Sequence, residues 1–276
     1  MATMNSLRQH RPLSDDDLRR HVPSLFATDP SERVSGRYAH IPTFQVVDGL
    51  RREGFVPVFA TQSRTRDPAR KDFTKHMVRF RHEGRQAVGL NEIFPEVVLV
   101  NSHDGSSSYQ ISSGVFRLVC LNGMTVAETD GESLRVRHQG DVVGKVIEGS
   151  YKVLGDAQET LRRVEGWQGV ALGRPMQEAM AEAAAVIRFG DADGNMPVEV
   201  RPDDMLRPRR AEDRKDDLWT TFNRLQEASI RGGVPLRNPE DGTRRRSREI
   251  TGIDQDQKVN KALWLLGERM AAILGR

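Results

Sequence analysis

Cysteine is almost absent from this chain of 276 residues, which contains a single one, Cys120. One thiol excludes an internal disulfide framework, and its position in an apolar run predicts a small buried side chain and not a nucleophile. Long hydrophobic runs are missing too, and the N-terminal residues lack the apolar stretch of a secretory signal. We therefore expect a cytoplasmic protein with no membrane partner.

Aromatic residues make up only 6% of the chain, with three Trp and three Tyr. Nucleic-acid bases would therefore find few stacking platforms, and Phe73 and Tyr109 are the candidates. The glycine motifs of P-loop and dinucleotide-binding proteins are absent, as are the Gly-x-Ser-x-Gly and His-Glu-x-x-His motifs. The familiar enzyme classes thus have no support in the sequence, and we expect no enzyme activity, no cofactor and no bound metal.

Charged residues are plentiful but unevenly distributed, although the formal net charge is only +3. Residues 51–85 hold ten Lys or Arg against four acids, and residues 206–276 hold sixteen against eleven. Residues 91–205 hold ten against eighteen. Two basic segments therefore flank an acidic one, and clustered positive charge is typical of polyanion binding. A well-solvated surface rich in Arg explains the same counts without a ligand.

Three dipeptides, Asp104-Gly105, Asn122-Gly123 and Asp130-Gly131, predict tight hairpin turns because their residues tolerate positive φ. The segments around them are apolar, β-branched or alternating, which predicts an antiparallel meander. With the earlier candidates, the predicted strands are residues 55–66, 74–82, 95–103, 107–121, 124–129 and 132–138.

Helix signals precede and follow these strands. Ser14 and the three Asp after it predict an N-capped helix to His21, and a second helix begins at Pro42-Thr43. Further helices are predicted for residues 141–164, 177–188 and the C-terminal region. Strands followed by helices indicate an α+β fold, with helices on one face of the sheet. We expect a core over residues 1–190, and a connector with a helical C-terminal region packing on it over residues 191–276.

A basic face of the sheet is the leading functional feature. In the strand over residues 74–82, alternate positions place Lys75, Arg79 and Arg81 on one face and Val78 and Phe80 on the other. A second cluster lies in an Arg-rich stretch, predicted to be a flexible loop, over residues 237–248. The predicted nucleic-acid-binding residues are Arg64, Arg66, Arg70, Lys71, Lys75, Arg79, Arg81, Arg117, Arg244, Arg245, Arg246 and Arg248.

The most distinctive short run is Asn101-Ser102-His103-Asp104-Gly105. His103 and Asp104 could supply metal ligands together with His76, His82 or Glu96 from adjacent strands. Turn chemistry at a strand end explains the same residues, and the sequence has no paired-His helix or Cys cluster to anchor a metal site. The turn interpretation is therefore preferred.

Five longer runs stand out, residues 37–43, 74–77, 101–109, 116–124 and 217–224. These runs resemble one family of phage- and plasmid-borne bacterial proteins, catalogued as domain of unknown function 932. The resemblance covers nearly the whole chain and implies a mobile-element setting, but no reaction and no catalytic residues. The order of helix, antiparallel meander with a basic face, and long helix is also similar to single-strand annealing proteins, which form rings or filaments on nucleic acid.

These features predict a non-enzymatic, homo-oligomeric protein, forming a ring or filament, that binds single-stranded DNA and promotes annealing or recombination for a mobile element. Two alternatives stay open. A host-defence antagonist of the anti-restriction type would use the basic face to bind an acidic protein. A metal-dependent nuclease would use His103 and Asp104.

Overall fold

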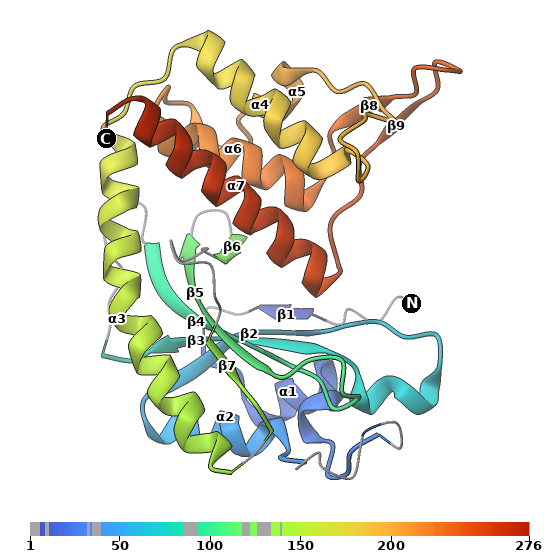
Figure 1. The fold of residues 1–276 in the computed structure, drawn as a ribbon, viewed down its shortest axis with the longest axis vertical. Helices are drawn as coiled ribbons and strands as arrows, with labels where there is room; N and C mark the ends of the chain where they lie inside the picture. Colours follow the sequence, from blue (N-terminus) through green and yellow to red (C-terminus); the bar gives the residue numbers. More distant parts are fainter. Residues whose placement is uncertain are drawn as a thin grey trace. The chain divides into compact units, whose positions relative to one another are not determined.

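The computed structural model describes residues 6–8, 11–31, 34, 40–84, 93–117, 122–125, 134–138 and 140–275. The chain divides into two compact units, residues 1–161 and residues 162–276 (Figure 1). The boundary lies inside one long helix. The boundary that the sequence suggested, at residue 190, falls one residue after a helix of the second unit.

The first unit contains an antiparallel sheet in the order β1-β2-β3-β4-β5-β6, with β7 also paired to β5. β6 pairs with residues 114–117 of β5 and β7 with residues 109–111, so both lie along β5. The α+β fold and the antiparallel sheet are as predicted. The strands are β1 Ser6–Arg8, β2 Phe55–Gln62, β3 His76–His82, β4 Ile93–Asn101, β5 Tyr109–Arg117, β6 Asn122–Thr125 and β7 Leu134–Val136.

The three predicted turns have different outcomes. Gly105 has φ of +78° in the loop between β4 and β5, which confirms the turn there. The turn predicted at Asn122-Gly123 is wrong, because both residues belong to β6 and Gly123 pairs with Phe116 of β5. Asp130-Gly131 and Cys120 lie outside the described residues.

One irregularity of the sheet follows from proline. The register of β2 against β3 shifts between Pro57 and Phe59, as expected for a strand residue that has no amide hydrogen. The carbonyl of Pro57 accepts a hydrogen bond from the amide of Leu13 at 2.7 Å. The segment before the first helix is thereby attached to the sheet.

Helices α1 Asp15–His21 and α2 Thr43–Arg52 cover one face of the sheet, together with the short 3-10 helix η1 Pro23–Phe26 (Figure 1). Ser14 caps α1 as predicted: its hydroxyl accepts from the amide of Asp17 at 3.2 Å, and the Asp17 carboxylate accepts from the amide of Ser14 at 3.0 Å. A further 3-10 helix, η2 Pro68–Phe73, connects β2 to β3.

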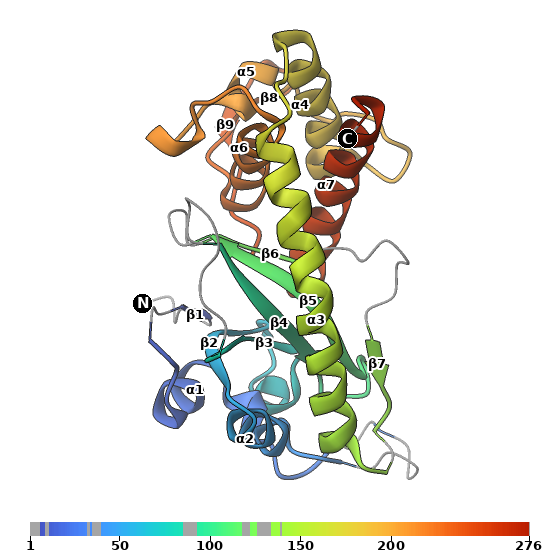
Figure 2. The ribbon, with the colours of Figure 1, turned by 90° about the vertical axis from the view of Figure 1, so that its left-hand side faces the viewer.

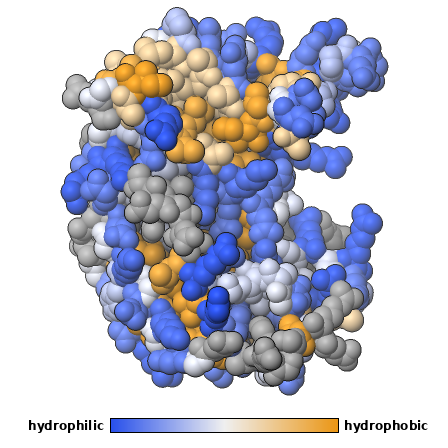
Figure 3. Space-filling view, in the orientation of Figure 1, coloured by the Kyte–Doolittle hydropathy of each residue, from blue (hydrophilic) through white to orange (hydrophobic). Residues whose placement is uncertain are grey.

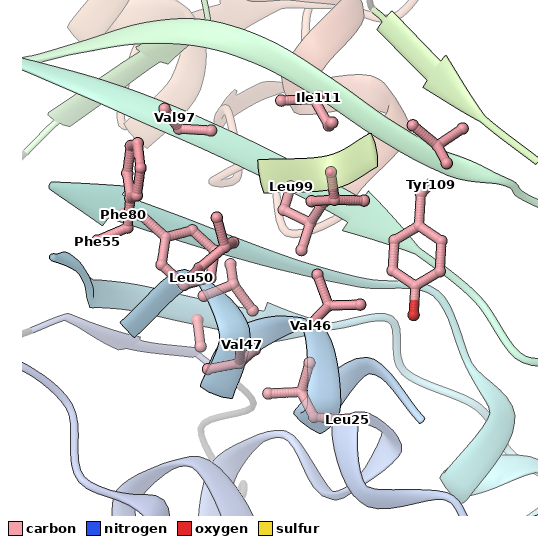
Figure 4. Close-up of a cluster of buried hydrophobic side chains, with 14 of the residues drawn as sticks. Leu25, Val46, Val47, Leu50, Phe55, Phe80, Val97, Leu99, Tyr109 and Ile111 are labelled. Atoms are coloured by element: carbon pink, nitrogen blue, oxygen red, sulfur yellow. The ribbon is translucent and has the colours of Figure 1, made fainter. Parts of the chain in front are cut away.

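The core of this unit lies between these helices and the sheet (Figure 4). Val78 and Phe80 are fully buried in it, as predicted, but Met77 and Arg79 at the alternate positions of β3 are buried too, so the opposite face of this strand is not exposed there. Val46, Val47 and Leu50 are the buried positions of α2 and pack at helical spacing against the strands. Burial of this amphipathic face, and not helix propensity, is what holds α2 in place.

Helix α3 Val142–Gln168 is continuous from the first unit into the second (Figure 2). Asp141 accepts a hydrogen bond from the amide of Gly144 at 2.9 Å, as expected for a residue at a helix N-terminus. Gly149 allows close packing, because a Cβ there would lie 2.3 Å from Leu134 and 2.9 Å from Ile111. The first half of α3 therefore lies directly against β5 and β7.

The second unit is mainly helical and contains one small hairpin. Its remaining helices are α4 Arg174–Phe189, α5 Pro202–Leu206, η4 Ala211–Asp213, α6 Leu218–Arg231 and α7 Ile253–Ile273. The hairpin is formed by β8 Pro235–Arg237 and β9 Arg244–Arg246. Helix α6 is its centre, since twelve of its fourteen residues are buried.

The core of the second unit is aromatic. The ring of Trp167 lies with its centroid 4.5 Å from that of Trp264 and 5.6 Å from that of Phe222, and Trp219 stacks on Phe222 at 5.8 Å. Gly267 on α7 packs against Trp167, where a Cβ would lie 2.4 Å from the indole. All three tryptophans of the chain are therefore used in packing. Among the described helices, none has the length and apolar character needed to cross a bilayer.

Candidate functional site

Buried histidines gather where strands β3, β4 and β5 end or begin. His76 is the first residue of β3, and His103 follows the end of β4. His76 and His103 are 1% and 0% exposed, and their ring centroids lie 5.3 Å apart. His138 follows β7 and is also buried, and His40 packs its ring 4.7 Å from that of His103. We call His40, His76, His103 and His138 the histidine cluster.

Thr43, the first residue of α2, is the centre of this cluster. Its hydroxyl oxygen lies 2.9 Å from Nε2 of His76, 3.1 Å from Nε2 of His103 and 3.0 Å from the side-chain nitrogen of Asn101. The hydroxyl of Tyr109 lies 3.3 Å from it and donates to the carbonyl of Ile41 at 3.1 Å. One buried oxygen thus joins α2 to three strands.

The hydrogen-bond partners assign the tautomers. Nδ1 of His76 lies 3.1 Å from the carbonyl of Thr74, which can only accept, so this nitrogen carries the proton. Nε2 of His76 therefore accepts from the hydroxyl of Thr43. Because that hydroxyl has a single proton, His103 must donate to Thr43 through Nε2. Nδ1 of His103 is then a buried lone pair, and it has no hydrogen-bond partner among the described residues.

Burial keeps the imidazoles of His76, His103 and His138 neutral. Desolvation lowers the pKa of His103 to about 2, and the neighbouring His76, His40 and His138 lower it further in the same direction. Burial likewise lowers the pKa of His76 to about 4, against the opposing effect of the Thr74 carbonyl. The pKa of His138 is lowered to about 4 by burial and by His40. At neutral pH His76, His103 and His138 are therefore uncharged.

The geometry does not gather the residues proposed for a nuclease into one site. His103 points into the cluster, whereas Asp104 accepts from the amide of Ser106 at 3.0 Å and pairs with Arg70 at 3.4 Å. His82 packs edge-on against Phe55. In the part of the chain that the structure describes, no group of three or more His, Cys, Asp or Glu residues is arranged to hold a metal ion.

The arginines of strand β3 are paired with a carboxylate. Nε of Arg79 lies 2.7 Å from one oxygen of Glu96 on β4, and Nε of Arg81 lies 3.0 Å from the other. The side chains of Arg79 and Glu96 are 4% and 1% exposed, and Arg81 also lies over the ring of Phe94 at 4.1 Å. This arrangement gives no support to a phosphate-binding role for Arg79 and Arg81, because both are enclosed with their counter-ion.

The other predicted cations of the first unit are exposed or half-buried, apart from one whose side chain lies outside the described residues. Arg64, Arg66 and Lys71 are exposed in and before η2, and Arg70 in the same loop is paired with Asp104. Lys75 is half-buried immediately before β3. The side chain of Arg117 lies outside the described residues. Of the candidate stacking residues, Tyr109 is fully buried and Phe73 is half-buried.

The hairpin of β8 and β9 presents the second predicted group of arginines. The sequence predicted a flexible loop here, and that prediction is wrong for Arg244, Arg245 and Arg246, which form β9. The turn is closed by Asp241, which accepts from the amide of Thr243 at 2.8 Å and from its hydroxyl at 2.7 Å. Gly242 has φ of +71°, which a residue with a Cβ rarely adopts.

The base of the hairpin is held by the rest of the second unit. Glu199 and Arg237 exchange two backbone hydrogen bonds, at 2.8 and 3.1 Å, and the Arg237 guanidinium donates to the Glu199 carboxylate at 2.8 Å. Arg188 donates to the carbonyls of Ser229 at 2.8 Å and of Arg248 at 3.0 Å. The short strands are therefore anchored on both sides.

The three arginines of β9 are all exposed. Arg246 donates to the carbonyl of Gly233 at 2.8 Å. For Arg244 and Arg245, no carboxylate partner is found within the described residues. Figure 3 shows hydrophilic surface around this hairpin, which projects at the upper right. Arg244 and Arg245 lie at successive strand positions, so they point to opposite faces of the hairpin. Each exposed guanidinium can bind two phosphate oxygens at once.

Sequence reasoning missed this hairpin although its signal was present. Asp241-Gly242 is the same type of dipeptide as Asp104-Gly105, and it lies between the two strands. The flanking segments are too short, polar and Arg-rich to show the apolar alternation of an ordinary strand. The turn dipeptide alone would have located it.

Comparison with known proteins places the chain among proteins without an assigned activity. The model of the family "Domain of unknown function (DUF932)" matches residues 30–264. The chain is 47% identical over 266 residues to the UPF0380 proteins YfjQ and YafZ of Escherichia coli strain K12, covering 96% of this chain and 94% of each relative. No solved structure matches.

Proposed function

Since the chain belongs to the DUF932 family, whose name states no activity, we propose a function from the geometry of the chain itself: it binds the phosphate backbone of single-stranded DNA through the arginines of the β8–β9 hairpin. The observation that carries the proposal is the exposure of Arg244 and Arg245 at successive positions of an anchored strand, one on each face of the hairpin, without a carboxylate partner among the described residues. Cationic side chains of this kind attract a polyanion and displace the counterions condensed on its phosphates.

The chemistry of the surface supports contact with phosphates more than with bases. The three tryptophans are buried in the core of the second unit, and Tyr109 is buried in the first. Binding that rests on phosphate contacts is independent of sequence and strongly dependent on salt. Arg64, Arg66 and Lys71 stay predicted contacts, because they are exposed in the first unit.

The test is a titration of an oligo-dT strand of about 30 nucleotides, followed by fluorescence anisotropy between about 50 and 200 mM salt. Arg244→Glu with Arg245→Glu should weaken binding about 10- to 100-fold. Loss of two phosphate contacts should also reduce the slope of log Kd against log salt by about 1.4. A duplex of the same length shows whether single strands are preferred.

The matched control is Arg20→Glu with Lys258→Glu, which changes the net charge equally at two exposed positions outside the hairpin. The control should retain most of the affinity and the salt slope. Equal weakening in both variants would contradict the proposal, because it would show that only net charge matters. Unchanged far-UV circular dichroism confirms that each variant is folded.

We propose further that the protein promotes annealing or recombination for a mobile element, and that it assembles into a ring or filament. Electron microscopy with and without the oligonucleotide checks assembly. Faster pairing of two complementary strands by the wild type than by the hairpin variant checks annealing. A protein that binds single strands but neither assembles nor anneals would limit the function to binding.

A further inference from the structure

The β8–β9 hairpin has two unlike faces. Residues paired directly across an antiparallel ladder lie on the same face, and successive residues alternate between faces. Leu236 pairs with Arg245 and is only 7% exposed, so this face is partly covered, although Arg245 itself reaches solvent. Arg237 pairs with Arg244 on the opposite face, where Arg246 also lies, and these three side chains are exposed. We call Arg237, Arg244 and Arg246 the outer arginines.

The outer arginines are crowded together. Backbone hydrogen bonds join residue 238 to residue 243 and residue 247 to residue 234, so Arg237 and Arg244 form a non-hydrogen-bonded pair of the ladder. Side chains of such a pair lie closer than those of a hydrogen-bonded pair, and like charges directly opposite each other destabilise a sheet. Arg246 adds a further charge to the same small surface, because it lies two residues along β9 from Arg244.

One carboxylate compensates part of this charge. The guanidinium of Arg237 donates to Glu199 at 2.8 Å, and the two side chains are 52% and 53% exposed. Arg246 donates to the carbonyl of Gly233 at 2.8 Å, which uses an N–H group but does not neutralise the charge. Within the second unit, which the structure describes up to its penultimate residue, neither Arg244 nor Arg246 has an ion pair with a carboxylate. An anionic ligand would relieve the repulsion that remains.

We propose that successive phosphates of a DNA strand bind along the outer arginines, and that Glu199 competes with them for Arg237. The inference rests on the DNA binding proposed above, and it adds the face that is used and a residue that limits the affinity. A phosphate can replace the carboxylate, because both accept two parallel hydrogen bonds from a guanidinium. The exchange costs little, since exposed ion pairs contribute little to stability. Glu199 thus lowers the repulsion on this face in the free chain and is displaced on binding.

The test is the oligo-dT titration with Glu199→Gln and, as a matched control, Glu240→Gln. Each variant removes one negative charge from an exposed position, at the base and at the turn of the hairpin, but only the first releases an arginine. The backbone hydrogen bonds between residues 199 and 237 remain in the variant. Glu199→Gln should tighten binding about two- to fivefold, as expected when an exposed competing ion pair is removed. Glu240→Gln should change the affinity less.

A second pair of variants assigns the gain to Arg237. Arg237→Gln should weaken binding and reduce the slope of log Kd against log salt by about 0.7, because one phosphate contact is lost. Adding Glu199→Gln to Arg237→Gln should then restore no more affinity than Glu240→Gln gives to the wild type. A full gain without Arg237 would show that Glu199 acts only through its charge, which would overturn the inference.

Failure of the inference differs from failure of the proposed function. If Glu199→Gln binds as Glu240→Gln does while the Arg244→Glu, Arg245→Glu variant is weakened, the hairpin binds DNA and the competition by Glu199 is wrong. If the latter variant binds as its own control does, the proposed function is wrong and the inference falls with it. Tighter binding of poly-glutamate than of oligo-dT would assign the outer arginines to an acidic protein and would also overturn the inference.

Discussion

The two units of the chain use polar and aromatic residues in opposite ways. All seven histidines belong to the first unit and all three tryptophans to the second. The first unit encloses Arg79 and Arg81 around one carboxylate, whereas the second exposes Arg244 and Arg245 on a hairpin. The net charge of a segment therefore does not tell whether its charged side chains are exposed. Arginine is a buried counter-ion in the first unit and a solvent-facing donor in the second.

The largest effect is expected from removing the buried carboxylate. Glu96→Ala removes the buried carboxylate that both Arg79 and Arg81 contact, which should lower the free energy of unfolding by about 3–5 kcal/mol. Urea denaturation followed by far-UV circular dichroism measures this loss. Tryptophan fluorescence follows the second unit separately, and its transition should change less.

The control for this variant is Asp48→Ala, which removes the exposed pair with Arg52, whose side chains are 42% and 78% exposed. An exposed pair within a helix contributes only about 0.3–0.5 kcal/mol, so this variant should unfold almost as the wild type does. A Glu96→Ala protein as stable as the control would show that the buried ion pair makes no net contribution.

The next largest effect is expected from acid, which should destabilise the first unit more than the second. The pKa values of His76 and His103 are about 4 and about 2 in the folded chain, against about 6.5 when unfolded. Below pH 6.5 the unfolded state therefore binds protons that the folded state does not, so stability is complete above about pH 7 and is lost as the pH falls toward 4. At pH 5.5 the two histidines together should cost about 3 kcal/mol.

The measurement is urea denaturation at pH 7.5, 6.5 and 5.5. Circular dichroism should show the falling stability of the first unit, and His103→Gln should reduce its dependence on pH. The fluorescence transition should change little over this range, because the second unit contains no histidine. An equal loss in both transitions would show that the units do not unfold separately.

The smallest of these effects concerns the aromatic core of the second unit. Gly267→Ala places a Cβ 2.4 Å from the Trp167 ring, so the indole must shift, and overpacking of this kind costs about 1–3 kcal/mol. Gly166→Ala is the matched control, since a Cβ there meets nothing within 4 Å. The control should gain stability of up to about 1 kcal/mol. Fluorescence-detected unfolding distinguishes the two, and a stabilised Gly267→Ala protein would contradict the packing.

Much of the fold could be predicted because its signals are local. The capping box at Ser14, the alternation of Val78 and Phe80 and the break at Pro57 each depend on residues close together in sequence. The Asn122-Gly123 turn failed because the same dipeptide is tolerated inside a strand, where pairing with Phe116 decides its conformation.

The candidate site was predicted less well because its partners are distant in sequence. Alternation correctly placed Arg79 and Arg81 opposite the core, but it carries no information on the neighbouring strand that supplies Glu96. The proximity of His103 and His76 was considered as a metal site, whereas the atom that joins them belongs to Thr43 on a helix. Strand register and helix docking decide both contacts, and neither can be read from local pattern.

The position of Thr43 constrains how this sequence can diverge. Its single hydroxyl is shared by side chains from a helix and from several strands, so replacing any one member leaves a mismatched donor or acceptor on the others. Serine keeps the oxygen but opens a methyl-sized void, and valine fills the space but removes the oxygen. In related proteins, a substitution at one of these residues should therefore be accompanied by substitutions at the others, and single replacements should be rare.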